Sequence, residues 1–233
     1  VRILMAAPSA DAAARHPHLA SPQPGGRVRV DLHTHTMWSG DSTTTPDEFA
    51  DAVGSSGLDV VCITDHNAIA GAEELSSRLD ARVVVGEELR TAAGEIIGLF
   101  LTERIPTVVG HVEAARAIRV QGGVVYVPHP FDPMRRNMSE AALDELAEAD
   151  LIDAIEVLNA KTSLPSLNRR AAEFAAEYGI VGGAGSDGHL PDALGAAYVE
   201  MDDFDTPLEF LAALASADVV GHHRDEPRPW PPR

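Results

Sequence analysis

The sequence predicts an α/β fold built on a parallel sheet. Short runs rich in Val and Ile alternate along the chain with segments of helical periodicity. Several of these runs are apolar on both faces, as buried parallel strands are, and helix start signals lie between them. The alternation predicts either an open doubly wound sheet or a barrel, and periodicity alone does not choose between the two.

Nine segments have the composition of strands. They are "RVRVDLH" (27–33), "LDVVCIT" (58–64), "ARVVVGEE" (81–88), "EIIGLFL" (95–101), "GGVVYVP" (122–128), "DAIEVLN" (153–159), "GIVGGAGS" (179–186), "AAYVEM" (196–201) and "DVVGHH" (218–223).

Four segments between these strands are predicted helices. Thr45-Pro46-Asp47-Glu48 offers an N-cap, a proline at the first helical position and a glutamate three residues after the cap, which together form a capping box. Thr206-Pro207-Leu208-Glu209 repeats the pattern. "SEAALDELAEA" (139–149) and "SLNRRAAEFAAEYG" (166–179) also have helical periodicity, and the second is expected to end near Gly179.

The composition allows one sizeable domain with an aliphatic core. Of the 233 residues, 45% are hydrophobic and only 5% aromatic. Residues 1–27 are rich in Ala, Pro, Ser and Gly and lack periodicity, so they are expected to form a flexible N-terminal tail. Residues 224–233 are expected to form a Pro-rich C-terminal tail. This division leaves 28–223 as a single domain.

The net charge limits the partners that we expect. The chain carries 36 acidic and 18 basic residues, a net charge of -18, which argues against binding to duplex nucleic acid. A small phosphorylated substrate held by metal ions and arginine remains compatible with this charge. No apolar run reaches the roughly 20 residues that a membrane-spanning helix needs, so we expect a cytoplasmic protein without a membrane partner. The oligomeric state is left open.

Five of the predicted strands lead into His, Asp or Glu side chains. The carboxyl ends of parallel strands form the functional rim of α/β folds, so these side chains should meet there. Any one of these histidines alone would be an ordinary loop or core residue, but the repeated position favours a metal site. The residues are His33, His35 and Asp41 after the first strand, Asp65 and His66 after the second, Glu87 and Glu88 at the end of the third, His129 after "GGVVYVP", and Asp187 and His189 after "GIVGGAGS".

The residue types indicate which metals would bind. His33 and His35 alternate along an extended segment and therefore point to the same side. Imidazole with carboxylate and no thiolate suits Zn, Mn or Fe. The number of donors exceeds the four ligands of one tetrahedral site, so two or three divalent ions that share a bridging carboxylate are expected.

The segments "DLHTHT", "SGDS", "GLDVVCITDHN", "GEEL", "YVPHP" and "GSDGH" occur in this order between residues 28 and 200. Together they resemble the PHP family, the polymerase and histidinol phosphatase domain. The resemblance implies a distorted (β/α)7 TIM-like barrel with a trinuclear metal centre at its C-terminal rim.

The same resemblance implies a metal ligand at each matching position. One ion would be held by His33, His35 and Asp187, and Glu88 would bridge it to a second ion held by Asp41, His66 and His189. A third ion would be held by His129. Glu95 stands where many relatives carry a histidine, and we expect it to serve as an oxygen ligand.

Five residues are expected to act on the substrate or on the ligands. Arg135 and Arg136 follow His129 on the same rim loop and are expected to bind phosphate. Asp65 or His189 could assist proton transfer. Asp31 is a candidate for orienting the imidazole of His33.

These expectations define a hydrolase of small phosphate esters, such as nucleotide or sugar phosphates. A metal-activated hydroxide at the di- or trinuclear centre would attack phosphorus in line. Two alternatives remain. A metal-dependent amidohydrolase would need a carboxylated lysine bridge, for which Lys161 is the only candidate in the chain. A non-catalytic, metal-stabilised module would resemble some PHP domains of polymerases.

Overall fold

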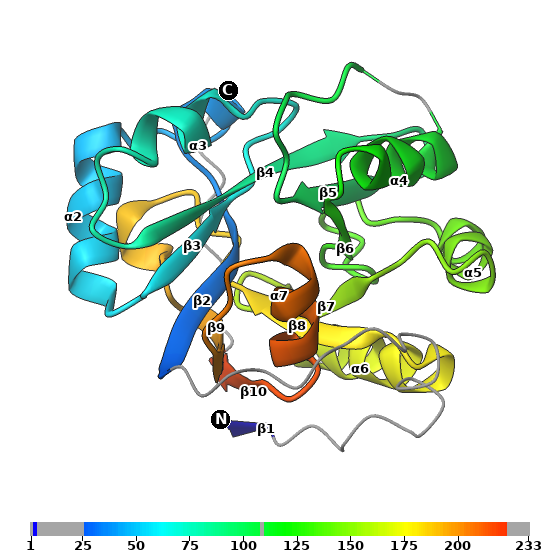
Figure 1. Ribbon diagram of the computed structural model, residues 1–233. Helices are drawn as coiled ribbons and strands as arrows, with labels where there is room; N and C mark the ends of the chain where they lie inside the picture. Colours follow the sequence, from blue (N-terminus) through cyan, green and yellow to red (C-terminus); the bar gives the residue numbers. More distant parts are fainter. Residues whose placement is uncertain (1, 4–25, 108–109, 223–233) are drawn as a thin grey trace.

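The computed structural model describes residues 2–3, 26–107 and 110–222. Its centre is one sheet in the order β1-β10-β9-β2-β3-β4-β5-β6-β7-β8. Figure 1 shows the strands gathered at the centre, with α2 to α6 arranged around the outside. The strands β2 to β8 have the bounds Arg27–Thr34, Val60–Ile63, Arg82–Arg90, Glu95–Leu99, Val124–Val127, Ala154–Asn159 and Val181–Gly185.

The two ends of this run of strands meet at the rim and nearly close a barrel. Thr34, the last residue of β2, forms a parallel bridge with Gly188, which follows β8. The Asp187 amide donates to the His33 carbonyl at 2.8 Å, and the His35 amide donates to the Gly188 carbonyl at 3.0 Å. The barrel expected from the resemblance is therefore confirmed, and the residues that close it are the ones that carry the predicted ligands.

One strand of the barrel runs against the others. β2, β3 and β4 are parallel, as are β6, β7 and β8, but β5 is antiparallel to both β4 and β6. Only residues 91–94 separate β4 from β5, whereas a parallel crossover needs roughly a dozen residues. The reversal matters for the site, because it brings the start of β5, Glu95, to the rim where β4 ends.

The four predicted helices are confirmed, and the described residues hold two more. Both capping boxes form, at Thr45 with Glu48 and at Thr206 with Glu209. Gly179 ends α6 in the left-handed conformation (φ 67°) that its sequence position predicts. The helices α2 to α7 have the bounds Pro46–Ser56, Ala70–Leu75, His111–Val120, Glu140–Glu148, Pro165–Tyr178 and Pro207–Leu214, and the short 3-10 helices η1 and η2 cover Met37–Ser39 and Pro191–Ala193.

The sheet extends beyond the barrel on the side of β2. Strand β9 (Ala197–Asp202) pairs antiparallel with β2, and β10 (Asp218–Gly221) pairs antiparallel with β9. Strand β1 (Arg2–Ile3) pairs with β10, so this part of the predicted N-terminal tail belongs to the sheet. Residues 4–25 and the predicted C-terminal tail, 224–233, lie outside the described residues.

Aliphatic side chains fill the interior, as the composition indicates. A large buried cluster that includes Leu32, Ile97 and Ile155 runs through the sheet and its helices. A smaller cluster around Phe49 and Ile63 lies between β3, α2 and α3. Among the helices of the described ranges, none combines the length and the apolar character that crossing a bilayer requires.

Candidate metal centre

All nine predicted metal ligands lie together at the C-terminal rim of the barrel. They form four overlapping groups, in each of which the donor atoms lie within 4.8 Å of one another. The groups are His35, Asp41, His66 and His189; His33, His129 and Asp187; His33, His35 and Glu88; and His66, Glu88 and Glu95.

Glu88 occupies the centre of this cluster. Its Oε2 lies 3.0 Å from His66 Nδ1, 3.3 Å from His35 Nε2 and 3.6 Å from His33 Nε2. Its Oε1 lies 3.2 Å from His129 Nε2. The carboxylate thus faces imidazoles from three separate strand ends, which is the position that a bridging ligand requires.

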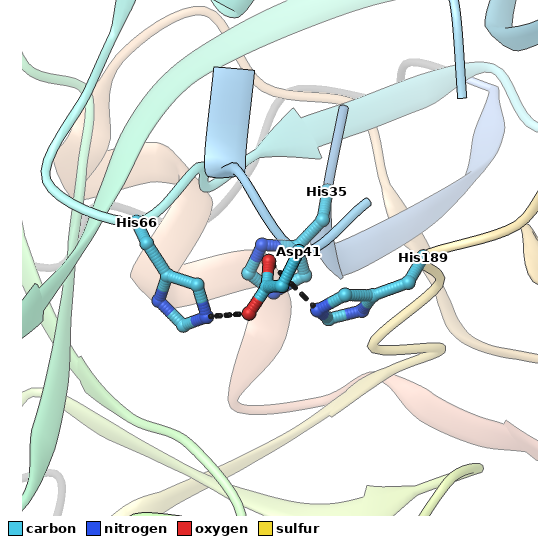
Figure 2. Close-up of side chains that lie close together, drawn as sticks. All are labelled: His35, Asp41, His66 and His189. Carbon is cyan, nitrogen blue, oxygen red and sulfur yellow. Dashed lines mark ion pairs between the residues drawn. The ribbon is translucent and has the colours of Figure 1, made fainter. Parts of the chain in front are cut away.

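Asp41 links the imidazoles at the outer side of the cluster. Its Oδ2 lies 3.1 Å from His66 Nε2 and its Oδ1 lies 3.4 Å from His189 Nε2, and Figure 2 shows both imidazoles turned toward this carboxylate. The rings of His35 and His189 are 4.1 Å apart between centroids. The resemblance assigns His35 to another ion, and the structure places its donor nitrogen within reach of this group as well.

Glu95 reaches the cluster from the reversed strand β5. Its Oε1 lies 3.8 Å from His66 Nδ1 and its Oε2 lies 3.8 Å from His129 Nε2. Arg90 also contacts this carboxylate, with Nε at 3.2 Å from Oε1. The Glu95 carboxylate therefore lies where the resemblance places a ligand, within 4 Å of two imidazoles.

The donor set fits divalent metal ions. The Nδ1 atom of His66 is buried and has no hydrogen-bond partner among the described residues, although it lies 3.0 Å from Glu88 Oε2. A nitrogen lone pair and a carboxylate brought together without a hydrogen bond are the arrangement that a shared ion stabilises. Imidazole and carboxylate donors without thiolate suit Zn, Mn or Fe.

The ionisation of Glu88 and His35 also suits a cation. Burial raises the pKa of Glu88, but the imidazoles of His66 and His33 hold that pKa well below its ordinary value. Burial together with neighbouring His189 lowers the pKa of His35 well below the ordinary value for histidine. An ionised carboxylate and a neutral imidazole are the forms that bind metal. Against the effect of burial, neighbouring carboxylates raise the pKa of the other four imidazoles, so a metal ion would displace a proton from them; these are His33, His66, His129 and His189.

Glu156 is a functional residue that sequence reasoning missed. This buried carboxylate on β7 accepts from His33 Nδ1 at 3.2 Å and from the His129 amide at 2.7 Å. Glu156 therefore fixes the orientation of the His33 imidazole and the position of the His129 main chain. A signal was present in "AIEVLN", because a glutamate inside an apolar strand is rarely buried without partners.

Asp31, the candidate for orienting the His33 imidazole, contacts the main chain of His33 and both the main chain and the side chain of Ser186. Its oxygens accept from the amides of His33, Ser186 and Gly195 at 3.2, 2.9 and 3.0 Å. Asp31 thus ties β2 to the chain that follows β8, while Glu156 holds the His33 imidazole.

Asp65 lies behind His35 and not at the mouth of the barrel. His35 Nδ1 donates to Ser39 Oγ at 2.7 Å, and Ser39 Oγ donates to Asp65 Oδ1 at 2.9 Å. The hydroxyl of Thr36 donates to the second carboxylate oxygen at 2.6 Å. Because Asp65 is buried and both of its oxygens accept hydrogen bonds, its contacts orient His35 through Ser39. The role of Asp65 or His189 in proton transfer stays a prediction.

The two adjacent arginines have different surroundings. Arg135 points to the site, with Nε 3.5 Å from Asp187 Oδ2. Arg136 is exposed, and its main-chain carbonyl accepts from the Glu95 amide at 2.9 Å. The expected phosphate contacts of both arginines stay predictions: the Arg135 side chain faces the cluster, whereas the Arg136 side chain is exposed.

Of the five non-glycine residues with positive φ in the described ranges, three lie at the ligands or next to one. His129 and Asp187 have positive φ angles of 28° and 50°, and Asn67, next to His66, has a φ of 51°. Such conformations cost about 1–3 kcal/mol each and persist only where surrounding contacts impose them. The strained residues follow β6, β8 and β3, so the rim holds its ligands in geometries that a free chain would avoid.

Gly185 allows β8 to approach His33, and replacing it with Ala should damage the site. A Cβ there would lie 2.4 Å from the His33 Cβ and 2.7 Å from Glu156 Oε1. We expect Gly185→Ala to lower metal affinity by about 10- to 100-fold, as loss of an outer contact does, and stability by about 1–3 kcal/mol. Metal titration and denaturant unfolding measure the two effects.

Gly54→Ala provides the matched control for this change. Gly54 lies within α2, and a Cβ there meets nothing within 4 Å. This variant should keep the metal affinity and gain up to about 1 kcal/mol of stability from helix propensity. Unchanged metal affinity in Gly185→Ala would contradict the inference that His33 and Glu156 need the close approach of β8 at Gly185.

Two relatives share most of their length with this chain. An uncharacterized protein of Methanocaldococcus jannaschii is 33% identical over 197 residues, which cover 80% of this chain and 79% of the relative. A second uncharacterized protein of the same organism is 38% identical over 146 residues, which cover 57% of this chain and 82% of the relative. A family profile described as PHP-associated matches residues 165–219.

A solved structure shares the fold. A two-domain protein from Bacteroides vulgatus, described as containing a predicted PHP-like metal-dependent phosphoesterase, matches with a TM-score of 0.70 and 17% identity, over 88% of this chain and 68% of that chain. Identity at this level shows the fold alone. Together with the relatives, the family profile and the cluster of imidazoles and carboxylates at the rim, it shows that the chain belongs to the PHP family.

Proposed function

We propose that this protein is a metal-dependent hydrolase of small phosphate esters, with two or three Zn, Mn or Fe ions at the rim. The observation that carries the proposal is the set of four overlapping donor groups, two of which share Glu88. Overlap of this kind lets neighbouring ions share a ligand, which is the arrangement used to hold both the attacking and the leaving oxygen of a phosphoryl group. Ions bound there would lower the pKa of a coordinated water from about 15.7 toward 7.

The exposed side of the cluster defines where a substrate enters. The side chain of His33 is fully buried, whereas those of Asp41 and His189 are 30% and 17% exposed. Arg135 and Arg90 border the cluster, with Arg90 Nη2 at 3.3 Å from Asp41 Oδ2. A phosphate arriving from this side would meet arginine guanidinium groups that can neutralise its oxygens.

The amidohydrolase alternative depends on Lys161, and its position does not favour that role. Lys161 Nζ lies 3.3 Å from Asp187 Oδ1, at the edge of the cluster. The central position between the imidazoles is held by Glu88. A carboxylated lysine would therefore not bridge the same ions.

Phosphate release by the metal-loaded protein tests the proposal. In a panel of nucleotides, sugar phosphates, oligonucleotide ends and amides, the phosphate esters should release inorganic phosphate with Mn or Zn, and the amides should not be hydrolysed. His33→Ala should abolish this turnover while circular dichroism stays unchanged, because the side chain supplies a ligand and not a part of the apolar core. Turnover of amides alone would favour the amidohydrolase, and bound metal without any turnover would favour a non-catalytic module.

A further inference from the structure

The only lysine of the chain lies at the edge of the metal centre. Lys161 Nζ lies 2.8 Å from His189 Nδ1 and 3.3 Å from Asp187 Oδ1. Its side chain is 31% exposed, so the ammonium group contacts both the ligands and the solvent at the mouth. A bridging role for Lys161 does not fit this position, so its contacts with His189 and Asp187 need another explanation.

A second cation lies beside it. Arg135 approaches the same carboxylate from another loop, with Nε 3.5 Å from Asp187 Oδ2. Its Nη2 donates to the main-chain carbonyl of Lys161 at 3.2 Å. The side chain of Arg135 is 18% exposed. The Lys161 ammonium and the Arg135 guanidinium, which come from different loops, thus both face the Asp187 carboxylate at the mouth of the barrel.

A buried aspartate fastens these two loops together. Asp132, on the loop after β6, is 1% exposed. Its Oδ2 accepts from the Ser163 amide at 2.9 Å, and its Oδ1 accepts from the Ser163 hydroxyl at 2.8 Å and from the Met134 amide at 3.0 Å. Ser163 lies on the loop after β7, two residues beyond Lys161. The positions of Lys161 and Arg135 are therefore built into the fold, and little ordering is needed to bind a ligand there.

The charge balance changes when metal binds. Lys161 Nζ and Arg135 Nε both face the single carboxylate of Asp187, at 3.3 Å and 3.5 Å from its two oxygens. Once Asp187 gives its charge to a metal ion, both cations lack a matching anion at the mouth. A dianionic phosphate group would supply it, with the guanidinium binding two oxygens and the ammonium acting as a point charge.

We propose that Lys161 and Arg135 form a phosphate subsite that selects terminal phosphate groups, which carry two charges near neutral pH, over singly charged phosphodiesters. This inference rests on the proposed phosphoesterase function and narrows its substrates to phosphomonoesters. Asp132 positions the two loops and does not contact the ligand.

Chemical protection of the lysine tests the subsite without requiring turnover. Because the chain holds one lysine, an amine-acetylating reagent can modify only Lys161 and the α-amino group, which mass spectrometry distinguishes. Inorganic phosphate should slow acetylation of Lys161 at least about fivefold in the metal-loaded protein, and sulfate should protect it as a matched anion. Arg135→Ala should lose the protection, whereas Arg136→Ala, with its exposed side chain one residue away, should keep it.

Kinetics supply the second measurement. Lys161→Gln should lower kcat/KM for phosphomonoesters at least about tenfold, as loss of a charge-assisted hydrogen bond does, and should weaken inhibition by inorganic phosphate. Lys161→Arg should restore part of the kcat/KM and part of the inhibition by inorganic phosphate. The metal content of both Lys161 variants should stay unchanged. The proposed subsite would be wrong if phosphate did not slow acetylation of Lys161, or if kcat/KM were unchanged in Lys161→Gln. An inactive wild-type protein whose Lys161 is still protected by phosphate would instead contradict the proposed function alone.

Discussion

Replacing Glu88 with Gln is expected to abolish metal-dependent turnover and to remove most of the bound metal. Glu88 is 1% exposed and lies between 3.0 and 3.6 Å from four imidazoles. Gln has nearly the same volume, so packing is preserved while the charge and one acceptor oxygen are lost. Removal of an outer-shell partner typically costs 10–100-fold, and loss of this central ligand should exceed about 100-fold. Metal analysis and phosphate release measure the two losses on the same sample.

Glu87 is the matched control for this substitution. It is buried like Glu88 but points to the opposite face of β4, where Oε2 accepts from the Ile105 amide at 2.8 Å. Arg104 Nε lies 3.9 Å from its other oxygen. Glu87→Gln keeps an acceptor for the amide and should leave metal content unchanged. Equal loss of metal in Glu87→Gln and Glu88→Gln would show that metal binding depends on any buried charge on β4. That result would contradict the bridging role of Glu88.

This pair also shows what a sequence can determine at the site. Adjacent residues of a strand point to opposite faces, so one of Glu87 and Glu88 had to face the ligands. The choice of Glu88 came from the resemblance, and the structure places Glu88 among the imidazoles. Arg135 and Arg136 lie in an irregular loop without such a period, so the sequence could not predict that only one of them points inward.

Long-range contacts account for the features that sequence reasoning missed. Strands and capping boxes depend on neighbours within a few residues, and they were predicted. Glu156 holds His33 across 123 positions of the chain, so nothing near either residue indicates the pair. The barrel itself could not be distinguished from an open sheet by periodicity, because closure depends on contacts between Thr34 and Gly188 that form only in three dimensions.

Removal of metal is expected to lower the thermal stability of the fold by a large amount. Four carboxylates and five imidazoles converge within short distances at the rim, and the strained backbone at His129 and Asp187 has to be maintained by contacts there. A ligand that binds only the folded state stabilises it by about 4 kcal/mol at a thousandfold excess over its Kd. Each kcal/mol shifts Tm by roughly 2–4 °C in a chain of this size, so loading with Mn or Zn should raise Tm by roughly 8–16 °C.

Thermal unfolding in chelator, followed by return of a single metal, measures this coupling. The rise in Tm should depend on metal concentration, because mass action sets its size. Glu88→Gln should show little of the rise, since it lacks the shared ligand, whereas Arg136→Ala should show all of it, since its side chain lies outside the cluster. If chelation removes the metal and Tm stays the same in the wild-type protein, the ions do not contribute to holding the rim. The strain at His129 and Asp187 would then have to be maintained by the hydrogen bonds of Glu156 and by those that close the barrel between β2 and β8.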